Sequence, residues 1–469
     1  HATSTTGNIT QSGALDIEGT TTLITSANDA TINLGTSSNA FTGALLITTN
    51  DSGADTAGDV SIHGGNTALV MGASTIDGDL TLTSTATGNK PITDTGTLKI
   101  RGTTTVSASG VNVTLNSAAN NFQGAVAIDG VNVTMVDAGA IDLGASTVTG
   151  TYTLTAGGAV TDSGALVISG VTTVNASSGD VTLNSAANNF QGAVAIDGVN
   201  VTMVDVGAID LGAVTVSGAY GITAGGAVTD SGTQEIAGVT TISASGQSVT
   251  LDTATNNFAD EVRITGAAVT IVDEDAIDLG TSTVSGAYTL TAGGDVTNSG
   301  ALAVTGATTV SATGRNVTLN TATNNFQGAV GITGANVSVV DAGAIVLGAS
   351  TVSGTYAVTA TASGGITDAG VLAITGTSTL KAAGGQSIIL DESSTFATVA
   401  FVASSGNLKN VEIKDSNAFD LSALALAKVG GAGGDLTVIA GGAITNITMA
   451  PISGDEKQMI AGGNMRRLL

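Results

Sequence analysis

Residues 120–126 read Asn-Asn-Phe-Gln-Gly-Ala-Val, and the same seven residues return at 188–194 and at 324–330. A variant, Asn-Asn-Phe-Ala-Asp-Glu-Val, occupies 256–262. Successive phenylalanines of these four segments are therefore 68 residues apart. Self-similarity at one fixed period is the sequence signature of a stacked repeat architecture.

Two further markers repeat with the same 68-residue step. A tyrosine series comprises Tyr152, Tyr220, Tyr288 and Tyr356, and a Thr-Asp-Ser-Gly-like series ends at Gly96, Gly164, Gly232 and Gly300. Because three independent markers agree, the chain is built from tandem copies of one unit.

Within each unit the apolar residues alternate, as expected for short strands with one buried face. In the segment 131–135, Val-Asn-Val-Thr-Met, the odd residues are predicted to point inward and the even ones outward. Gly and Ser-Gly pairs separate the strands and mark the corners. The sequence therefore predicts an all-β parallel β-solenoid of about 20 coils, with about 22–24 residues a coil and three coils in each 68-residue repeat. At one strand spacing per coil, such a rod would be on the order of 100 Å long.

The composition is that of an all-β chain. It contains 66 Gly, 42% hydrophobic residues and only 10% charged residues in 469 positions, against roughly 25% charged residues in an ordinary soluble domain. The net charge of −25 argues against a nucleic-acid partner, because phosphate contacts need a basic patch. With no cysteine, the fold must be stabilised by repetition, without disulfides. No apolar run is long enough to span a membrane.

The repeat pattern divides the chain into four regions. Residues 1–90 are expected to form a first, divergent repeat with an insertion near residue 50. Residues 91–396 hold the regular repeats, 397–448 the divergent terminal coils, and 449–469 a tail that does not repeat.

The segment 152–174, Tyr-Thr-Leu-Thr-Ala-Gly-Gly-Ala-Val-Thr-Asp-Ser-Gly-Ala-Leu-Val-Ile-Ser-Gly-Val-Thr-Thr-Val, resembles the repeats of large filamentous-haemagglutinin-like bacterial surface proteins. The resemblance extends to about residue 448. It implies a right-handed β-helical shaft that is secreted to the cell surface or the extracellular matrix. It also implies a role in adhesion, aggregation or biofilm structure, with cell-surface or matrix glycans as candidate partners.

Carboxylates recur in pairs, and hard oxygen ligands are what Ca²⁺ prefers. The pairs are Asp137 with Asp142, Asp205 with Asp210, and Asp273 with Asp278, whereas in the fourth copy Val346 replaces the partner of Asp341. They are candidate Ca²⁺ ligands, but Ca²⁺ needs six to eight oxygens, and a solvated face or corner capping explains the same pattern. No other cofactor is expected.

Nothing in the sequence predicts an enzyme. Paired carboxylates can cleave glycosidic bonds, but a catalytic pair copied at every repeat, and missing one member in the fourth, is not expected of an active site. Two histidines, His1 and His63, leave little material for a triad or a metal centre. A polysaccharide-degrading β-helix enzyme is therefore a remote alternative.

The two ends of the repeat region are in the same phase, since Gly-Asn-Ile-Thr at 7–10 corresponds to Gly-Ala-Ile-Thr at 442–445. The chain is therefore expected to act as a structural or adhesive rod that assembles with itself head to tail. The alternative is a shaft segment of a larger adhesin. The predicted assembly residues are Ile9, Gln11, Ile444, Asn446, Met465, Arg466, Arg467, Leu468 and Leu469.

Overall fold

The computed structural model describes residues 1–50, 57–86, 88–176, 178–421, 424–426, 429, 434–445, 459–461 and 464–466. The chain forms two compact units, His1–Gly238 and Val239–Leu469. Within the described residues there is no α-helix, and no helix has the length and apolarity needed to cross a membrane.

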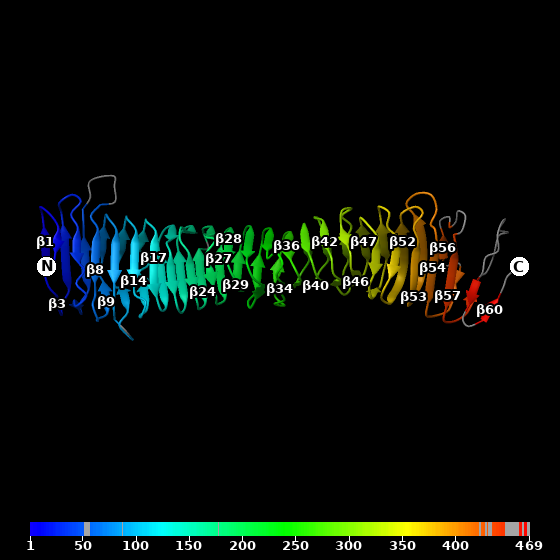
Figure 1. Ribbon diagram of the computed structural model, residues 1–469, viewed down its shortest axis with the longest axis horizontal. Helices are drawn as coiled ribbons and strands as arrows, with labels where there is room; N and C mark the ends of the chain where they lie inside the picture. Colours follow the sequence, from blue (N-terminus) through cyan, green and yellow to red (C-terminus); the bar gives the residue numbers. More distant parts are fainter. Residues whose placement is uncertain are drawn as a thin grey trace. The chain divides into compact units, whose positions relative to one another are not determined.

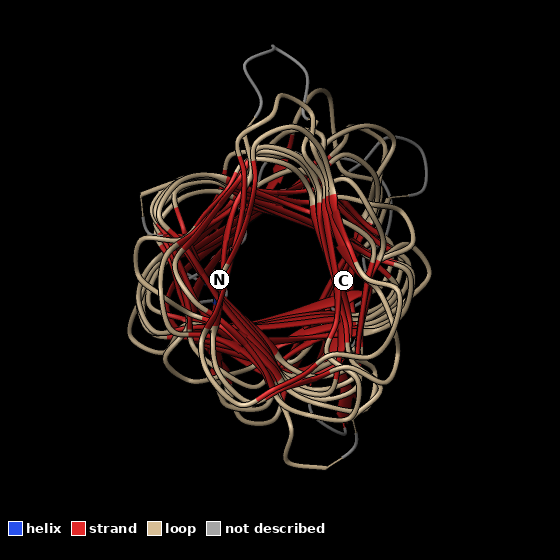
Figure 2. Ribbon diagram, turned by 90° about the vertical axis from the view of Figure 1, so that its left-hand side faces the viewer, coloured by secondary structure: helices blue, strands red, loops and turns tan. Residues whose placement is uncertain are grey.

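The fold is an all-β parallel β-solenoid of about 20 turns, as the sequence predicted. In each unit the strands follow one another in chain order along the solenoid axis (Figure 1). The end view shows the strands as the walls and the turns on the outside (Figure 2). Most strands pair in parallel with the third strand after them, so three strands make one coil.

One repeat of the first unit contains ten strands. They are β14 (Thr104–Ser107), β15 (Val113–Leu115), β16 (Asn121–Phe122), β17 (Val126–Gly130), β18 (Val133–Asp137), β19 (Ile141–Leu143), β20 (Ser146–Val148), β21 (Tyr152–Ala156), β22 (Val160–Asp162) and β23 (Leu166–Ile168). The next repeat starts with β24 (Thr172–Ala176) and reaches its Asn-Asn-Phe segment at β26 (Asn189–Phe190).

The second unit repeats the same order. Its first ten strands are β33 (Thr240–Ser243), β34 (Val249–Leu251), β35 (Asn257–Phe258), β36 (Val262–Gly266), β37 (Val269–Asp273), β38 (Ile277–Leu279), β39 (Ser282–Val284), β40 (Tyr288–Ala292), β41 (Val296–Asn298) and β42 (Leu302–Val304). Later strands are longer, notably β52 (Leu372–Ala382) and β53 (Ile388–Ala403), and an antiparallel hairpin of β59 (Met459–Ala461) and β60 (Asn464–Arg466) follows.

The structure corrects the expected three coils per repeat. Ten strands at three per coil make three and a third coils, so the average coil is shorter than the sequence predicted. The register joins Thr104 to Val126 but Asp129 to Thr147, so the coil that starts at Asp129 is shorter than the one that starts at Thr104. The shortest strands, such as β16, carry too little periodicity to be counted from sequence, which is why the prediction missed the extra strand.

Because each repeat contains one strand more than three full coils, the next repeat begins one face further round the solenoid. The Asn-Asn-Phe strand β16 stacks on β13 (Leu98–Ile100), whereas the next copy, β26, stacks on β23. The stack below β23 runs through β20, β17 and β14, and β13 belongs to a different stack. Equivalent residues of neighbouring repeats in the first unit therefore lie on different faces.

The core is a column of inward side chains. Val133 and Met135 of β18 are fully buried, as predicted, whereas Val131 lies in the bend before the strand and is half-buried. The large interior positions are filled by the repeat-marking aromatics, of which Phe122, Phe190, Tyr152 and Tyr220 are 1–2% exposed. Each buried aromatic side chain removes a large apolar area from water, so these few residues contribute strongly to the stability of the core.

Each repeat also turns one threonine into this core. Thr172 is 1% exposed, lies in register between Tyr152 and Val194, and its hydroxyl has no hydrogen-bond partner among the described residues. Thr104, Thr240 and Thr308 are likewise 0–1% exposed, and their hydroxyls also have no hydrogen-bond partner among the described residues. A buried hydroxyl without a partner costs about 1–3 kcal/mol.

We therefore expect Thr172→Val, which keeps the side-chain shape, to raise the free energy of unfolding by about 1–2 kcal/mol. The measurement is urea denaturation followed by circular dichroism. Thr173→Val, one residue on and facing outward, is the matched control and should change stability by less than about 0.5 kcal/mol. A loss of stability in Thr172→Val would mean that the hydroxyl has a partner in solution.

Candidate functional site

The Asn-Asn-Phe segment begins with a buried amide that connects two coils. Asn120 is 0% exposed, and its Oδ1 accepts a hydrogen bond of 2.8 Å from the backbone N–H of Leu98 in the preceding coil. Its Nδ2 donates to Asp94 Oδ2 at 2.7 Å. The equivalent Asn188 makes the same two bonds, to Leu166 at 2.8 Å and to Asp162 at 2.6 Å.

The aspartates of the Thr-Asp-Ser-Gly-like marker complete this connection. Asp162 accepts hydrogen bonds from the backbone N–H groups of Asn184 and Ser185, at 2.8 and 3.1 Å. These are the turn residues just before Asn188. Two markers that look independent in the sequence are thus hydrogen-bonded to each other.

A second aspartate reaches the same segment from the following coil. Asp205 is 2% exposed; its Oδ2 accepts a hydrogen bond from Phe190 N–H at 2.6 Å, and its Oδ1 accepts one from Gly207 N–H at 2.7 Å. The equivalent bonds join Asp137 to Phe122 and Gly139, Asp273 to Phe258 and Asp275, Asp341 to Phe326 and Gly343, and Asp415 to Phe396 and Asn417.

We call these three residues the polar corner: an aspartate, the buried asparagine and a second aspartate. Copies within one unit are Asp94–Asn120–Asp137, Asp162–Asn188–Asp205 and, with asparagine in place of the first aspartate, Asn298–Asn324–Asp341; Ser394 replaces the central asparagine between Asp368 and Asp415. Apart from the local bond to the N–H two residues after the second aspartate, its hydrogen bonds lie between neighbouring coils, so its role is to hold the coils in register.

The structure separates the predicted metal ligands. Asp137, Asp205 and Asp273 are buried with both carboxylate oxygens engaged by backbone N–H groups. Asp142, Asp210 and Asp278 are only half-buried and belong to the next strand. Among the described residues, no three His, Asp or Glu side chains come together in a way that could hold a metal ion.

The three half-buried aspartates, Asp142, Asp210 and Asp278, which we call the outer aspartates, differ in their hydrogen-bond partners. Asp278 accepts hydrogen bonds from the hydroxyl of Thr297 at 3.0 Å and from the N–H of Ser299 at 2.9 Å. Asp142 accepts a longer one, 3.4 Å, from the hydroxyl of Thr161. One carboxylate oxygen of Asp210 is buried and, in the described part of the chain, has no partner.

Burial changes the acid–base behaviour of several aspartates of the polar corner. Desolvation raises the pKa of Asp273 to about 6, although the N–H groups of Phe258 and Asp275 act to lower it. Desolvation also raises the pKa of Asp368 to about 6, and it raises the pKa values of Asp137, Asp205 and Asp341. These carboxyls bind protons more tightly in the folded protein than in the unfolded chain.

We therefore expect stability to fall as the pH rises from 4 to 6. Between the usual carboxyl pKa of about 3.8 and the folded value of about 6, the folded state holds more protons than the unfolded state, so the free energy of unfolding decreases with pH. Thermal denaturation should give a higher midpoint at pH 5 than at pH 7.5. Asp273→Asn should make this slope shallower, and an equal or steeper slope in that variant would contradict the assignment.

Of the predicted assembly residues, Ile9, Ile444, Met465 and Arg466 lie in strands, and Gln11 follows directly after a strand. Ile9 is in β2 (Ile9–Thr10) and pairs with Ile32, and Ile444 is in β58 (Ile444–Thr445) and pairs with Phe419. Gln11 is hydrogen-bonded to Asn39 through both ends of its amide. Met465 and Arg466 are in β60, whereas Asn446, Arg467, Leu468 and Leu469 lie outside the described residues.

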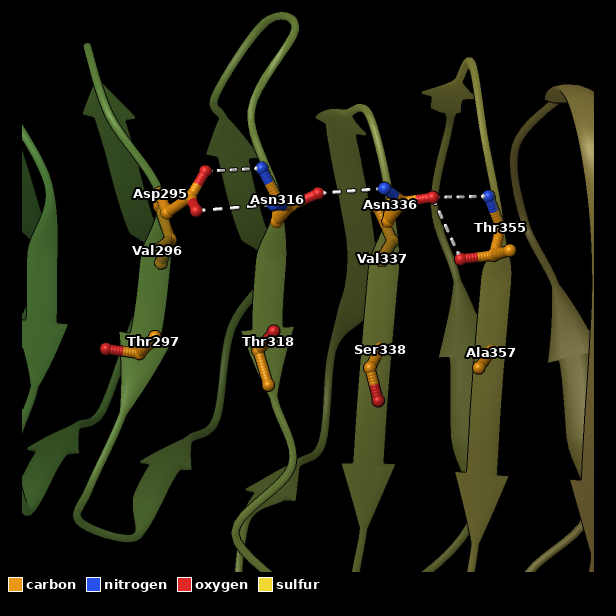
Figure 3. A pocket seen from close by; sticks show the side chains of 10 residues that line it. All are labelled: Asp295, Val296, Thr297, Asn316, Thr318, Asn336, Val337, Ser338, Thr355 and Ala357. Carbon is orange, nitrogen blue, oxygen red and sulfur yellow. Dashed lines mark hydrogen bonds between the residues drawn. The ribbon is translucent and has the colours of Figure 1, made fainter.

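Sequence reasoning missed a ladder of side chains on the outer surface of the second unit (Figure 3). Asp295 accepts hydrogen bonds from the backbone N–H and the Nδ2 of Asn316, at 2.8 and 3.2 Å. Asn316 Oδ1 accepts one from Asn336 at 2.9 Å, and Asn336 Oδ1 accepts two from Thr355 at 3.0 and 3.1 Å. The pKa of Asp295 is lowered, chiefly by the hydrogen bond that its carboxylate accepts from the backbone N–H of Asn316.

The ladder forms one side of a shallow hollow of about 430 Å³, whose lining also includes Thr297, Thr318 and Ser338. The first unit carries an equivalent ladder, in which Asn132 joins Asn112 to Thr151. The lining offers hydroxyls, amides and one carboxylate, but no histidine, lysine or cysteine. Such a surface offers hydrogen-bond donors and acceptors.

Comparison with known proteins identifies the class of the chain. The family described as repeats of unknown function (DUF5649) matches residues 1–48, 57–129, 130–197, 198–265, 266–333 and 334–403. The chain belongs to this repeat family, and the matched copies 130–197, 198–265 and 266–333 are each as long as the period of the sequence markers. Residues 49–56, which the match skips, fall in the expected insertion. No curated protein and no solved structure matches the chain.

Proposed function

We propose that this chain is a structural, adhesive rod of the bacterial cell surface or extracellular matrix, without enzymatic activity. The observation that carries the proposal is the polar corner. Asp162, Asn188 and Asp205, the polar residues that mark the repeat, are all used to bind one coil to the next. A chain whose recurring polar groups serve coil stacking is built for length and rigidity, because each coil is stabilised by its neighbours.

The proposal includes head-to-tail assembly with further copies. Stacked coils pair through their strand edges, and an unpaired edge is a template for another chain. The strands β2 and β58 have the same Ile-Thr sequence in the same phase and both pair in parallel with a neighbouring coil. A head-to-tail contact of this kind repeats without closing and gives a filament.

The resemblance to filamentous-haemagglutinin-like proteins supports this localisation and role, and also supports the second candidate, a shaft segment of a larger adhesin. The six consecutive matches to one repeat family are what either candidate requires. Because the outer aspartates are candidate Ca²⁺ ligands, the electron microscopy below is done both with and without Ca²⁺.

Electron microscopy of the purified native protein, with and without Ca²⁺, distinguishes the two candidates. Assembly predicts long uniform fibres, and Ile9→Lys should abolish them, because a charge would then face the joint. Thr155→Lys, which adds the same charge on an exposed strand position, is the control and should leave the fibres intact. Separate rods under all conditions would overturn assembly and favour the shaft.

A further inference from the structure

Beside each polar corner lie three amide side chains that the stacking of coils does not use. In the first regular repeat they are Asn116, Asn121 and Gln123, on either side of the turn at residues 117–120. Asn116 and Gln123 are exposed, Asn121 is half-buried, and none of the three side chains has a hydrogen bond among the described residues. We call this group the amide patch.

The patch recurs in later repeats at the same exposed or half-buried positions. The second copy is Asn184, Asn189 and Gln191, and a later copy is Asn320, Asn325 and Gln327. Other exposed positions do vary between repeats: Ala138 corresponds to Val206 and to Glu274. Asn120 is fixed by its buried bonds, but no side-chain hydrogen bond among the described residues accounts for Asn121 or Gln123.

We infer that the amide patches bind a neutral, hydroxyl-rich polymer, that is, an uncharged glycan. A primary amide presents two N–H donors and one carbonyl acceptor, which is the complement of a sugar hydroxyl that both donates and accepts. The net charge of −25 disfavours polyanions such as acidic polysaccharides or nucleic acid. This inference rests on the proposed adhesive role and names its partner class.

The fold sets how the patches are displayed. Because β16 and β26 belong to different strand stacks, the first two patches face different sides of the solenoid. One straight glycan chain along a single face therefore meets only one of these two patches. The arrangement suits the capture of several chains around one protein, each chain bound at its own patch.

The chain holds its own comparison copy. The third repeat has Asp252, Asn257 and Ala259 at the three patch positions, followed by Asp260 and Glu261. A carboxylate replaces one amide and a methyl group replaces another, so this copy should not bind a neutral glycan.

Affinity electrophoresis in native gels tests the inference directly. The full chain is run through gels containing dextran, galactomannan or hydroxyethyl cellulose as neutral polymers, or alginate as an anionic one. We expect retardation by at least one neutral polymer and none by alginate. Replacing the amides of three patches in one variant (N121A, Q123A, N189A, Q191A, N325A, Q327A) should remove most of the retardation. Changing one patch should remove less than changing all three.

The control variant changes Thr155, Thr223 and Thr291 to Ala; these exposed threonines lie outside the patches at the same 68-residue step. Its retardation should equal that of the native protein, and circular dichroism should show both variants folded. Absence of retardation by every neutral polymer, equal retardation of both variants, or retardation by alginate alone would overturn the inference. Fibre formation is scored separately, so fibres without retardation would reject glycan binding and leave the structural role standing.

Discussion

Gly164→Ala should destabilise the first unit by about 2–4 kcal/mol, since it adds an atom where two coils touch. A Cβ at Gly164 would lie 2.1 Å from the backbone nitrogen of Ala145 and 2.6 Å from its Cα. Backbone atoms cannot rotate away as a flexible side chain can, so the coils must separate locally. Urea denaturation would measure the loss, and hydrogen exchange should show the opening at the coils around Ala145.

The matched control is Gly13→Ala. Gly13 holds the same place in the sequence, after Thr-Gln-Ser instead of Thr-Asp-Ser, but a Cβ there meets nothing within 4 Å. Its effect should stay below about 0.5 kcal/mol. Equal losses in the two variants would mean that glycine is required for its backbone conformation, and the close approach of coils would not be the cause.

Asp205→Ala should cost about 3–5 kcal/mol, the second large effect expected. The substitution removes the acceptor for the N–H groups of Phe190 and Gly207, and each buried donor left without a partner costs about 1–3 kcal/mol. Asp205→Asn keeps one acceptor oxygen and should lose roughly half as much. Chemical denaturation of the three proteins at pH 7.5 would give the series.

Asp210→Ala is the control, because Asp210 was paired with Asp205 as a candidate Ca²⁺ ligand. Position 346, its equivalent in the fourth repeat, is already Val, so this change should cost less than about 0.5 kcal/mol. Repeating the measurements with Ca²⁺ and with EDTA tests the metal alternative. If Asp205→Ala and Asp210→Ala lower the free energy of unfolding equally and Ca²⁺ stabilises only the native chain, the two aspartates form a metal site, and the role assigned to the polar corner is wrong.

The amide patch and the polar corner both use residues of the segment 120–126, but we expect the patch to act in binding and the corner in coil stacking, and variants can separate the two roles. Changes at Asn120 or Asp137 should act on stability, because both are buried between coils. Changes at Asn121 or Gln123 should leave stability nearly unchanged and act on binding. A solenoid stabilised by nearest-neighbour coils tolerates such outward changes well, since each affects one coil only.

The sequence by itself determined the parallel β-solenoid and the 68-residue repeat. It could do so because alternation, glycine at corners and identical spacing are local or periodic signals. Val133 and Met135 point inward as their strand parity predicts. The sequence also offered corner capping as one explanation of the repeated aspartates.

The tertiary structure alone decided how the coils stack. The pairing of Asp129 with Thr147 but of Thr104 with Val126 shows that coil length varies from corner to corner, and no local signal sets that length. The same stacking joins Asp162 to Asn188 of the next coil and divides each aspartate pair between core and surface. Such contacts depend on which residues of the neighbouring coil lie alongside, and that register follows only from the summed lengths of the turns between them.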